Sequence, residues 1–304
     1  MLRATRRLRI RHTTRYSYDA PIQRSTHRLH LRPVDDWKQN LLAYELTVKP
    51  HAAVIEYEDA FGNRTQRFEV NEPYMALEVT AESLVEVLDT DPFGFARLPI
   101  KPPTWPLVWM PSERTMLAPY LNPTDLPDTQ LHDIYDYAME FATRNNGDLM
   151  ETLFAINLAF LHDFKYVPGC TDLGTTAYQV FVNKAGVCQD FTNLFITMAR
   201  LLGVPARYVC GYIHTGNSGA SRTGSDATHA WIQLYIPNIG WKGFDPTNGV
   251  LPRTDHVRVA HGRNFRDATP MSGTLYGKAN ETMTVDVEVT DALQATHASV
   301  LQAT

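Results

Sequence analysis

The 304-residue sequence has little cysteine, no long apolar run and no excess of positive charge, and each shortage argues against a class of protein. Its cysteines, Cys170, Cys188 and Cys210, are too few and odd in number for a disulfide framework, which favours a reducing compartment and predicts a cytoplasmic location. No window approaches about 18 consecutive apolar residues, so we expect no membrane-spanning helix and no membrane partner. The 28 Lys and Arg residues are outnumbered by 33 Asp and Glu residues, so no nucleic-acid partner is expected either.

The one local excess of positive charge lies in the first eleven residues, which include Arg3, Arg6, Arg7, Arg9 and Arg11. No apolar stretch follows these arginines, so a secretory signal is not expected. We interpret the run as a solvated strand face in preference to a nucleic-acid-binding arm.

The composition predicts a folded chain of two domains. Hydrophobic residues make up 44% and aromatic residues 11%, which excludes disorder over most of the length. The first ninety residues hold short β-rich runs without a helical period, which predicts an antiparallel β-sandwich. Nine prolines then fall between Asp91 and Pro127, and we interpret this stretch as a connector because proline lacks a backbone N–H. The predicted domains are therefore an N-terminal β-sandwich over residues 1–120 and a catalytic core over residues 121–304.

Helical patterns dominate after the connector. Two pairs have the spacing of helix N-terminal capping boxes: Asp148 with Glu151, and Thr176 with Gln179. From Phe191 to Leu202 the apolar residues recur with the period of an amphipathic helix, which Gly203 and Pro205 end. Strand-like runs follow at residues 206–214, 228–236, 240–245 and 282–290. Helices packed on an antiparallel sheet make the predicted fold class α+β.

Three residues of this region have the chemistry and the order of a cysteine acyl-transfer site. Cys188 stands at the start of the amphipathic helix, where unpaired N–H groups and the helix dipole favour a thiolate. His229 lies on a following strand, on the face that alternation gives to Trp231 and other polar or aromatic side chains. Asp245 ends the next strand and could orient the histidine ring.

Each of the three has a plainer interpretation. Cys188 could be a small buried residue, His229 a packing histidine, and Asp245 the opener of an Asp-Pro turn. Their order along the chain favours catalysis: a nucleophile on a helix N-terminus, a base on a following strand, and an orienting carboxylate on the strand after that.

Four blocks of this region resemble the bacterial transglutaminase-like family, part of the papain-like superfamily whose members are often described as cysteine proteases. The blocks are residues 186–191, 200–212, 226–231 and 240–249. Further pieces resemble the N-terminal β domain and the end of the family: residues 16–21, 27–33, 59–63 and 262–277. The resemblance covers nearly the whole chain and implies a β-sandwich followed by a transglutaminase-like, papain-like core.

Residue by residue, the resemblance implies that Cys188 is the nucleophile, His229 the general base and acid, and Asp245 the orienting carboxylate. Asp190 and Trp231 match positions commonly found beside the site. We interpret Asp190 as a first-turn carboxylate with a positional role or a plain complement to the helix dipole, and Trp231 as a packing wall.

The donors that would stabilise an oxyanion are less specified. The backbone N–H of Cys188 is one candidate, and the side chain of Gln179 or Tyr178 could supply another.

The predicted function is a cysteine-dependent acyl transfer on amide bonds of a peptide or protein substrate through a thioester, by a protease, an amidase or a transglutaminase-like enzyme. The alternative is a non-catalytic protein-binding module on the same fold. A metal site from Cys188, His229 and Asp245 is disfavoured, because no C-x-x-C or H-x-x-x-H pair is present, and no cofactor is expected. The sequence leaves the acceptor, water or an amine, and the oligomeric state open.

Overall fold

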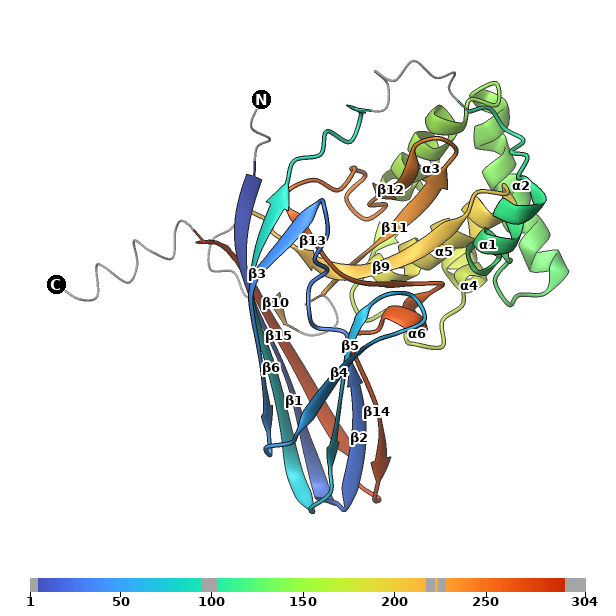
Figure 1. The fold of residues 1–304 in the computed structure, drawn as a ribbon. Coiled ribbons are helices and arrows are strands. Elements are labelled where there is room, and N and C mark those ends of the chain that lie inside the picture. Colours follow the sequence, from blue (N-terminus) through green and yellow to red (C-terminus); the bar gives the residue numbers. More distant parts are fainter. Residues whose placement is uncertain (1–4, 95–102, 217–221, 224–227, 293–304) are drawn as a thin grey trace.

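The computed structural model describes residues 5–94, 103–216, 222–223 and 228–292. It consists of a long β-sandwich beside a smaller sheet that helices cover on one side (Figure 1). The predicted α+β class, with an N-terminal antiparallel sandwich and a core of helices on an antiparallel sheet, is confirmed. Among the described residues, no helix is both long and apolar enough to cross a bilayer.

The larger sheet of the sandwich contains five antiparallel strands. Their spatial order is β10 (Arg222–Thr223), β15 (Glu281–Asp291), β1 (Thr5–Ile22), β6 (Tyr74–Leu88) and β3 (Gln39–Lys49). Along β1, exposed arginines alternate with Leu8 and Ile10, which are buried. Arg7 pairs with Glu86 across the sheet at 2.9 Å. Arg6, Arg7, Arg9 and Arg11 therefore lie on a solvated strand face, as predicted, while Arg3 lies outside the described residues.

The second sheet of the sandwich contains four strands. Their order is β14 (Met271–Tyr276), β2 (Arg24–Leu29), β5 (Arg64–Val70) and β4 (Val54–Glu58). Buried side chains of both sheets, such as Leu29, Phe68 and Val79, form one apolar core between them.

The chain returns to the sandwich at its C-terminal end. β14 pairs with β2 and β15 pairs with β1, both antiparallel, and Figure 1 shows these red strands among the blue ones. This pairing differs from the expected assignment of all of residues 121–304 to the catalytic core. A single cut near residue 120 separates strands that share a sheet, because hydrogen bonds between distant strands leave no local signal in the sequence.

The proline-rich stretch is more ordered than a plain connector. Pro111–Leu121 form helix α1, with Pro111 in the first turn, where a missing N–H breaks no helical bond. The indole N–H groups of Trp105 and Trp109 donate to the carbonyls of Leu202 and Gly203 at 2.9 Å each. The stretch therefore caps the end of a helix in the core; residues 95–102 lie outside the described part.

Four further helices build the half of the molecule that holds the candidate catalytic residues: α2 (Asp128–Arg144), α3 (Leu149–Asp163), α4 (Ala177–Asn183) and α5 (Cys188–Leu201). Both predicted caps are present. The Asp148 carboxylate accepts the N–H of Glu151 at 2.9 Å, and Thr176 and Gln179 exchange side-chain bonds with each other's backbone N–H.

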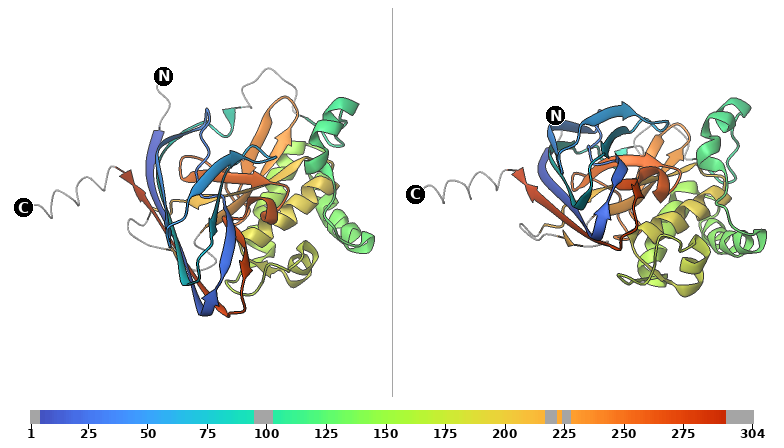
Figure 2. Two further views of the ribbon diagram at one scale, coloured as in Figure 1. Left: turned by 60° about the horizontal axis from the view of Figure 1, so that its bottom comes forward. Right: turned by 90° about the horizontal axis from the view of Figure 1, so that it is seen from below.

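These helices pack on a four-stranded sheet of order β12 (Gly240–Phe244), β11 (His229–Ile236), β9 (Ala206–Ile213) and β13 (His256–Gly262), with the short helix α6 (Phe265–Ala268) after β13. Apolar side chains of β11, such as Ile232 and Leu234, join those of α5 in the main core. The sheet also contacts the sandwich, where Tyr212, Val257 and Leu8 belong to one apolar cluster and Arg258 pairs with Asp36 at 2.6 Å. Figure 2 shows the sheet lying between sandwich and helices.

This second contact explains a difference from the expected strand pattern. The face of β11 that holds His229, Trp231 and Gln233 was expected to be polar, yet all three side chains are buried. Because sandwich and helices cover both sides of the sheet, its polar side chains must find partners inside the protein.

Candidate active site

Cys188 is the first residue of α5 and follows a pair of short parallel strands. β8 (Ala185–Gly186) pairs in parallel with β7 (Lys165–Tyr166), and the chain then turns directly into the helix. A Cβ atom at Gly186 would lie 2.8 Å from the Cβ of Asp190, so only glycine fits this turn. The thiol is 6% exposed. It therefore stands at the positive end of the helix dipole, where first-turn N–H groups have no helical partner.

Asp190 ties this helix start to a neighbouring loop. Its Oδ2 accepts the backbone N–H of Val187 at 2.9 Å and the hydroxyl of Thr171 at 2.6 Å. Burial raises the pKa of Asp190, and these two hydrogen bonds oppose the shift. The carboxylate thus holds the segment after β7 against the first turn of α5, next to Cys188.

His229 begins β11 and pairs with Gly211 of β9. Gly211 is required there, since a Cβ atom would lie 2.0 Å from the carbonyl of Val257 and 2.7 Å from the Trp231 ring. The imidazole Nε2 lies 2.8 Å from Asp245 Oδ2, and the Cys188 side chain is close enough to the ring to help raise its pKa. Since Nε2 faces Asp245, Nδ1 is the nitrogen left for the thiol.

The charge of His229 follows from these partners. Burial disfavours the imidazolium, but the Asp245 carboxylate and the Cys188 side chain outweigh it and raise the pKa of His229 to about 10. A charged ring beside the thiol is the setting in which cysteine becomes a thiolate nucleophile.

Asp245 is completely buried at the end of β12 and accepts many hydrogen bonds. Its Oδ2 accepts from His229, from His256 at 3.0 Å and from the Asn248 side chain at 2.7 Å. Its Oδ1 accepts the backbone N–H groups of Thr247 and Asn248 at 3.1 and 3.3 Å. Burial raises the pKa of Asp245, but the two histidines lower it far more, so the carboxylate is ionised.

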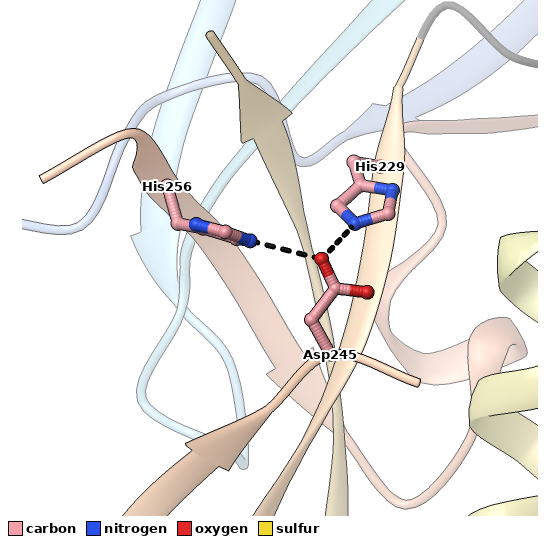
Figure 3. A group of neighbouring side chains, drawn as sticks. All are labelled: His229, Asp245 and His256. Atoms are coloured by element: carbon pink, nitrogen blue, oxygen red, sulfur yellow. Dashed lines mark hydrogen bonds and ion pairs between the residues drawn. The ribbon is translucent and has the colours of Figure 1, made fainter. Parts of the chain in front are cut away.

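Figure 3 shows this carboxylate between the two imidazole rings, with one dashed contact to each. Sequence reasoning missed His256 and Asn248. The run from His256 to Gly262 forms strand β13, and its alternation of valines with polar residues was the available signal. Asn248 lies only three residues after Asp245, within the predicted turn.

The other predicted supporting residues lie in different settings. Trp231 is buried, with ring centroids 5.8 Å from His229 and 5.2 Å from His256, which is the position of a packing wall. The side chain of Gln179 is used in the cap of α4, and the Tyr178 hydroxyl donates to Asp133 at 2.8 Å. The Tyr178 hydroxyl is engaged by this bond, whereas the cap uses only Oε1 of Gln179 and not its Nε2 donor, so the role of Gln179 as an oxyanion donor stays a prediction.

His229, Asp245 and His256 also have the ligand types of a metal site, with donor atoms within 4.8 Å of one another. Tetrahedral zinc with bonds of about 2.0 Å would keep its ligand atoms about 3.3 Å apart. Here the Nε2 atoms lie 2.8 and 3.0 Å from one carboxylate oxygen, which is hydrogen-bond geometry. The arrangement fits N–H donors on both rings better than it fits a metal ion.

A pocket of about 520 Å³ lies in the same half of the molecule as Cys188, but away from it. It is lined by Arg200, Arg263 and residues of α1, at the other end of α5 from Cys188. Arg200 donates there to the backbone carbonyls of Ala206 and Arg263 at 2.9 and 2.6 Å, which is a packing role.

Comparison with known proteins matches both halves of the chain. The bacterial transglutaminase-like N-terminal region matches residues 8–86, and the transglutaminase-like superfamily matches residues 136–246. A protein-glutamine gamma-glutamyltransferase of Pseudomonas aeruginosa is 31% identical over 77 residues, which cover 24% of this chain and 11% of that protein.

Two similarities extend over nearly the full length. A crystal structure described as a "Putative Cysteine Protease from Cytophaga hutchinsonii" has a TM-score of 0.75 at 23% identity, covering 95% of this chain and 91% of that one, and so has the same fold. An uncharacterized protein of Mycobacterium tuberculosis is 33% identical over 97% of both chains. By these matches, the chain belongs to the bacterial transglutaminase-like family.

Proposed function

We propose that the protein is a cysteine-dependent acyl-transfer enzyme that acts on amide bonds of peptides or proteins. In this proposal Cys188 is the nucleophile, His229 the general base and acid, and Asp245 the orienting carboxylate. The observation that carries it is the 2.8 Å contact between the buried His229 Nε2 and the Asp245 carboxylate, at a ring whose pKa the Cys188 side chain also raises. A binding module would have no use for such a charged pair at a helix start.

The first half of the reaction uses the thiolate and the helix start. The sulfur attacks the carbonyl carbon of the amide, and the backbone N–H of Cys188 is placed to stabilise the oxyanion. His229 then gives its proton to the leaving amine, so the C–N bond breaks and a thioester remains on Cys188.

The second half restores the enzyme. Neutral His229 takes a proton from the incoming acceptor, which attacks the thioester carbonyl and releases the Cys188 thiolate beside a recharged imidazolium. Water as acceptor gives hydrolysis and a primary amine gives transamidation. The names of the Cytophaga hutchinsonii and Pseudomonas aeruginosa proteins represent one outcome each, and both require the same thioester.

The proposal includes the cytoplasmic location that the low cysteine content predicts. All three cysteines are free thiols, Cys170 exposed and the other two buried. They also supply an internal comparison. Burial raises the pKa of Cys210 to about 12, so this thiol is expected to be inert.

The test is alkylation of the full chain with iodoacetamide at pH 6, with the labelled residue mapped by mass spectrometry. We expect Cys188 to react before the exposed Cys170, and His229→Ala to slow the reaction. Cys188→Ala should abolish peptide hydrolysis and incorporation of a fluorescent primary amine, while Cys170→Ala and Cys210→Ala keep both. If Cys188 reacts no faster than Cys170, the binding-module alternative becomes the better account.

A further inference from the structure

His256 lies between two carboxylates and is almost completely buried. Its Nε2 is 3.0 Å from Asp245 Oδ2 and its Nδ1 is 2.7 Å from Asp255 Oδ1. An ionised carboxylate can only accept hydrogen bonds, so both ring nitrogens must carry protons. Burial disfavours this charge, but the two carboxylates raise the pKa of His256. The geometry thus makes His256 an imidazolium.

Asp245 is therefore shared by two charged rings. His229 and His256 both donate to the same oxygen, Oδ2, and their ring centroids are 5.9 Å apart. From His229 through Asp245 and His256 to Asp255, the groups alternate in charge along one hydrogen-bonded row. Each carboxylate–imidazolium contact in such a row depends on the next, because a carboxylate that neutralises one ring holds the other less strongly.

We propose that His256, held doubly protonated by Asp255, is a positioning residue that takes up part of the charge of Asp245 and so leaves the His229 proton transferable to the leaving amine. The inference rests on the proposed acyl transfer at Cys188. It assigns to β13 a role beyond packing, because the second histidine sets how tightly the first one keeps its proton.

Three basic groups near His256 have acidic neighbours of their own. Lys38, Arg253 and Arg258 line a small cavity of about 60 Å³ beside it. Arg253 pairs with Asp89 at 2.7 Å, and Arg258 pairs with Asp36 at 2.6 Å. Lys38 is near Asp36 as well, and burial lowers its pKa to about 8. On the other sides the ring meets Trp231, His229 and the two carboxylates.

The proposal predicts the direction of a pH effect. Without the charge of His256, Asp245 would hold the His229 proton more tightly, and His229 would lose it only at higher pH. The rate of Cys188 alkylation by iodoacetamide, measured against pH on the full chain, should report this as the alkaline inflection. A residue that only fills space would change the rate without moving the inflection.

The experiment compares four variants with the wild type. His256→Gln keeps an N–H donor for Asp245 but no charge, and we expect its alkaline inflection to move up by about one pH unit. Asp255→Asn should move it in the same direction by less. His256→Leu also removes the donor and should lose at least about tenfold in rate, while His256→Gln stays within about threefold at its optimum. His30→Gln removes a buried sandwich histidine, bonded to Thr65 at 3.0 Å, and should leave the inflection in place.

An unmoved inflection in both His256→Gln and Asp255→Asn, with near-ultraviolet circular dichroism unchanged, would overturn the proposal while fast labelling of Cys188 upheld the proposed function. Equal losses in His256→Gln and His256→Leu would also overturn it, since packing alone would then explain the residue. Should His256→Gln fail to fold, Asp255→Asn still decides, because the Asp255 side chain is 38% exposed and tolerates substitution better.

Discussion

Two pairs of buried histidines, one pair in each half of the molecule, are held in opposite charge states. His12 and His27 in the sandwich are 1% and 3% exposed, and His229 and His256 in the catalytic sheet are 4% and 3% exposed. Burial lowers the pKa of the two sandwich histidines to about 4. The two catalytic-sheet histidines have raised pKa values in spite of burial. Burial alone does not decide the charge.

The partners make the difference. His12 lies between the hydroxyls of Tyr212 and Thr14, 3.0 Å from each, and His27 lies 2.8 Å from the hydroxyl of Ser25. A hydroxyl can donate or accept, so a neutral ring is satisfied by it. The partners of His229 and His256 are carboxylates at 2.7 to 3.0 Å, which stabilise the charged ring. The imidazole ring is therefore neutral beside hydroxyls, at His12 and His27, and charged beside carboxylates, at His229 and His256.

Removing the charge of Asp245 should have the largest effect on the difference between the two pairs of histidines. Asp245→Asn leaves His229 without the charge that holds it protonated and oriented, and we expect alkylation of Cys188 at pH 6 to fall by at least about 10³-fold. The matched control is Asp59→Asn, which changes a carboxylate 3.3 Å from the buried His30 of the sandwich. If both variants keep the wild-type rate, Asp245 does not hold His229 in the charged, oriented state that activates Cys188.

Acid should destabilise the sandwich, because its buried histidines are neutral in the folded protein. The unfolded chain protonates His12 near pH 6.5, whereas the folded chain does so only near pH 4, so stability is lost as the pH falls through this window. For His12 the loss is about 3 kcal/mol. His12→Gln cannot titrate and should lose that much less between pH 6.5 and 4 in urea unfolding. Identical pH dependence in both proteins would show that His12 is already charged in the fold.

The smallest expected effect comes from removing the Thr171 hydroxyl, which donates to the buried Asp190 carboxylate. Thr171→Val removes the 2.6 Å hydrogen bond to Asp190 and should cost about 1 kcal/mol in urea unfolding. Because Thr171 has no contact with His229 or Asp245, alkylation of Cys188 should stay within about threefold of the wild type. A loss as large as that of Asp245→Asn would mean that the loop, and not the carboxylate, positions the thiol.

Much of the fold follows from local sequence signals. The capping pairs at Asp148 and Thr176, the amphipathic helix after Cys188 and the alternation along β1 are all short-range patterns, and the structure has each of them. The return of β14 and β15 to the sandwich could not be predicted in this way. It depends on hydrogen bonds between strands more than two hundred residues apart, as in the pairing of Leu8 with Asp291.

The candidate site divides along the same line. Cys188, His229 and Asp245 are found by residue type and order, because each stands at a helix or strand end that the sequence marks. His256 belongs to a strand separated from β11 by β9, and its contact with Asp245 exists only because three strands bring their ends together. The oxyanion donors were not fixed by the sequence, since Gln179 also serves its own helix, where its Oε1 accepts the N–H of Thr176.

The charge difference between His229 and His256 on the one hand and His12 and His27 on the other can be read in one nuclear magnetic resonance experiment. The full chain is labelled with ¹⁵N-histidine at pH 7.5, and the ring signals are assigned with the His12→Gln, His27→Gln, His229→Gln and His256→Gln variants. We predict a proton on both ring nitrogens of His229 and His256, and on one ring nitrogen of His12 and His27. A neutral His229 ring in the folded wild-type protein would contradict the account.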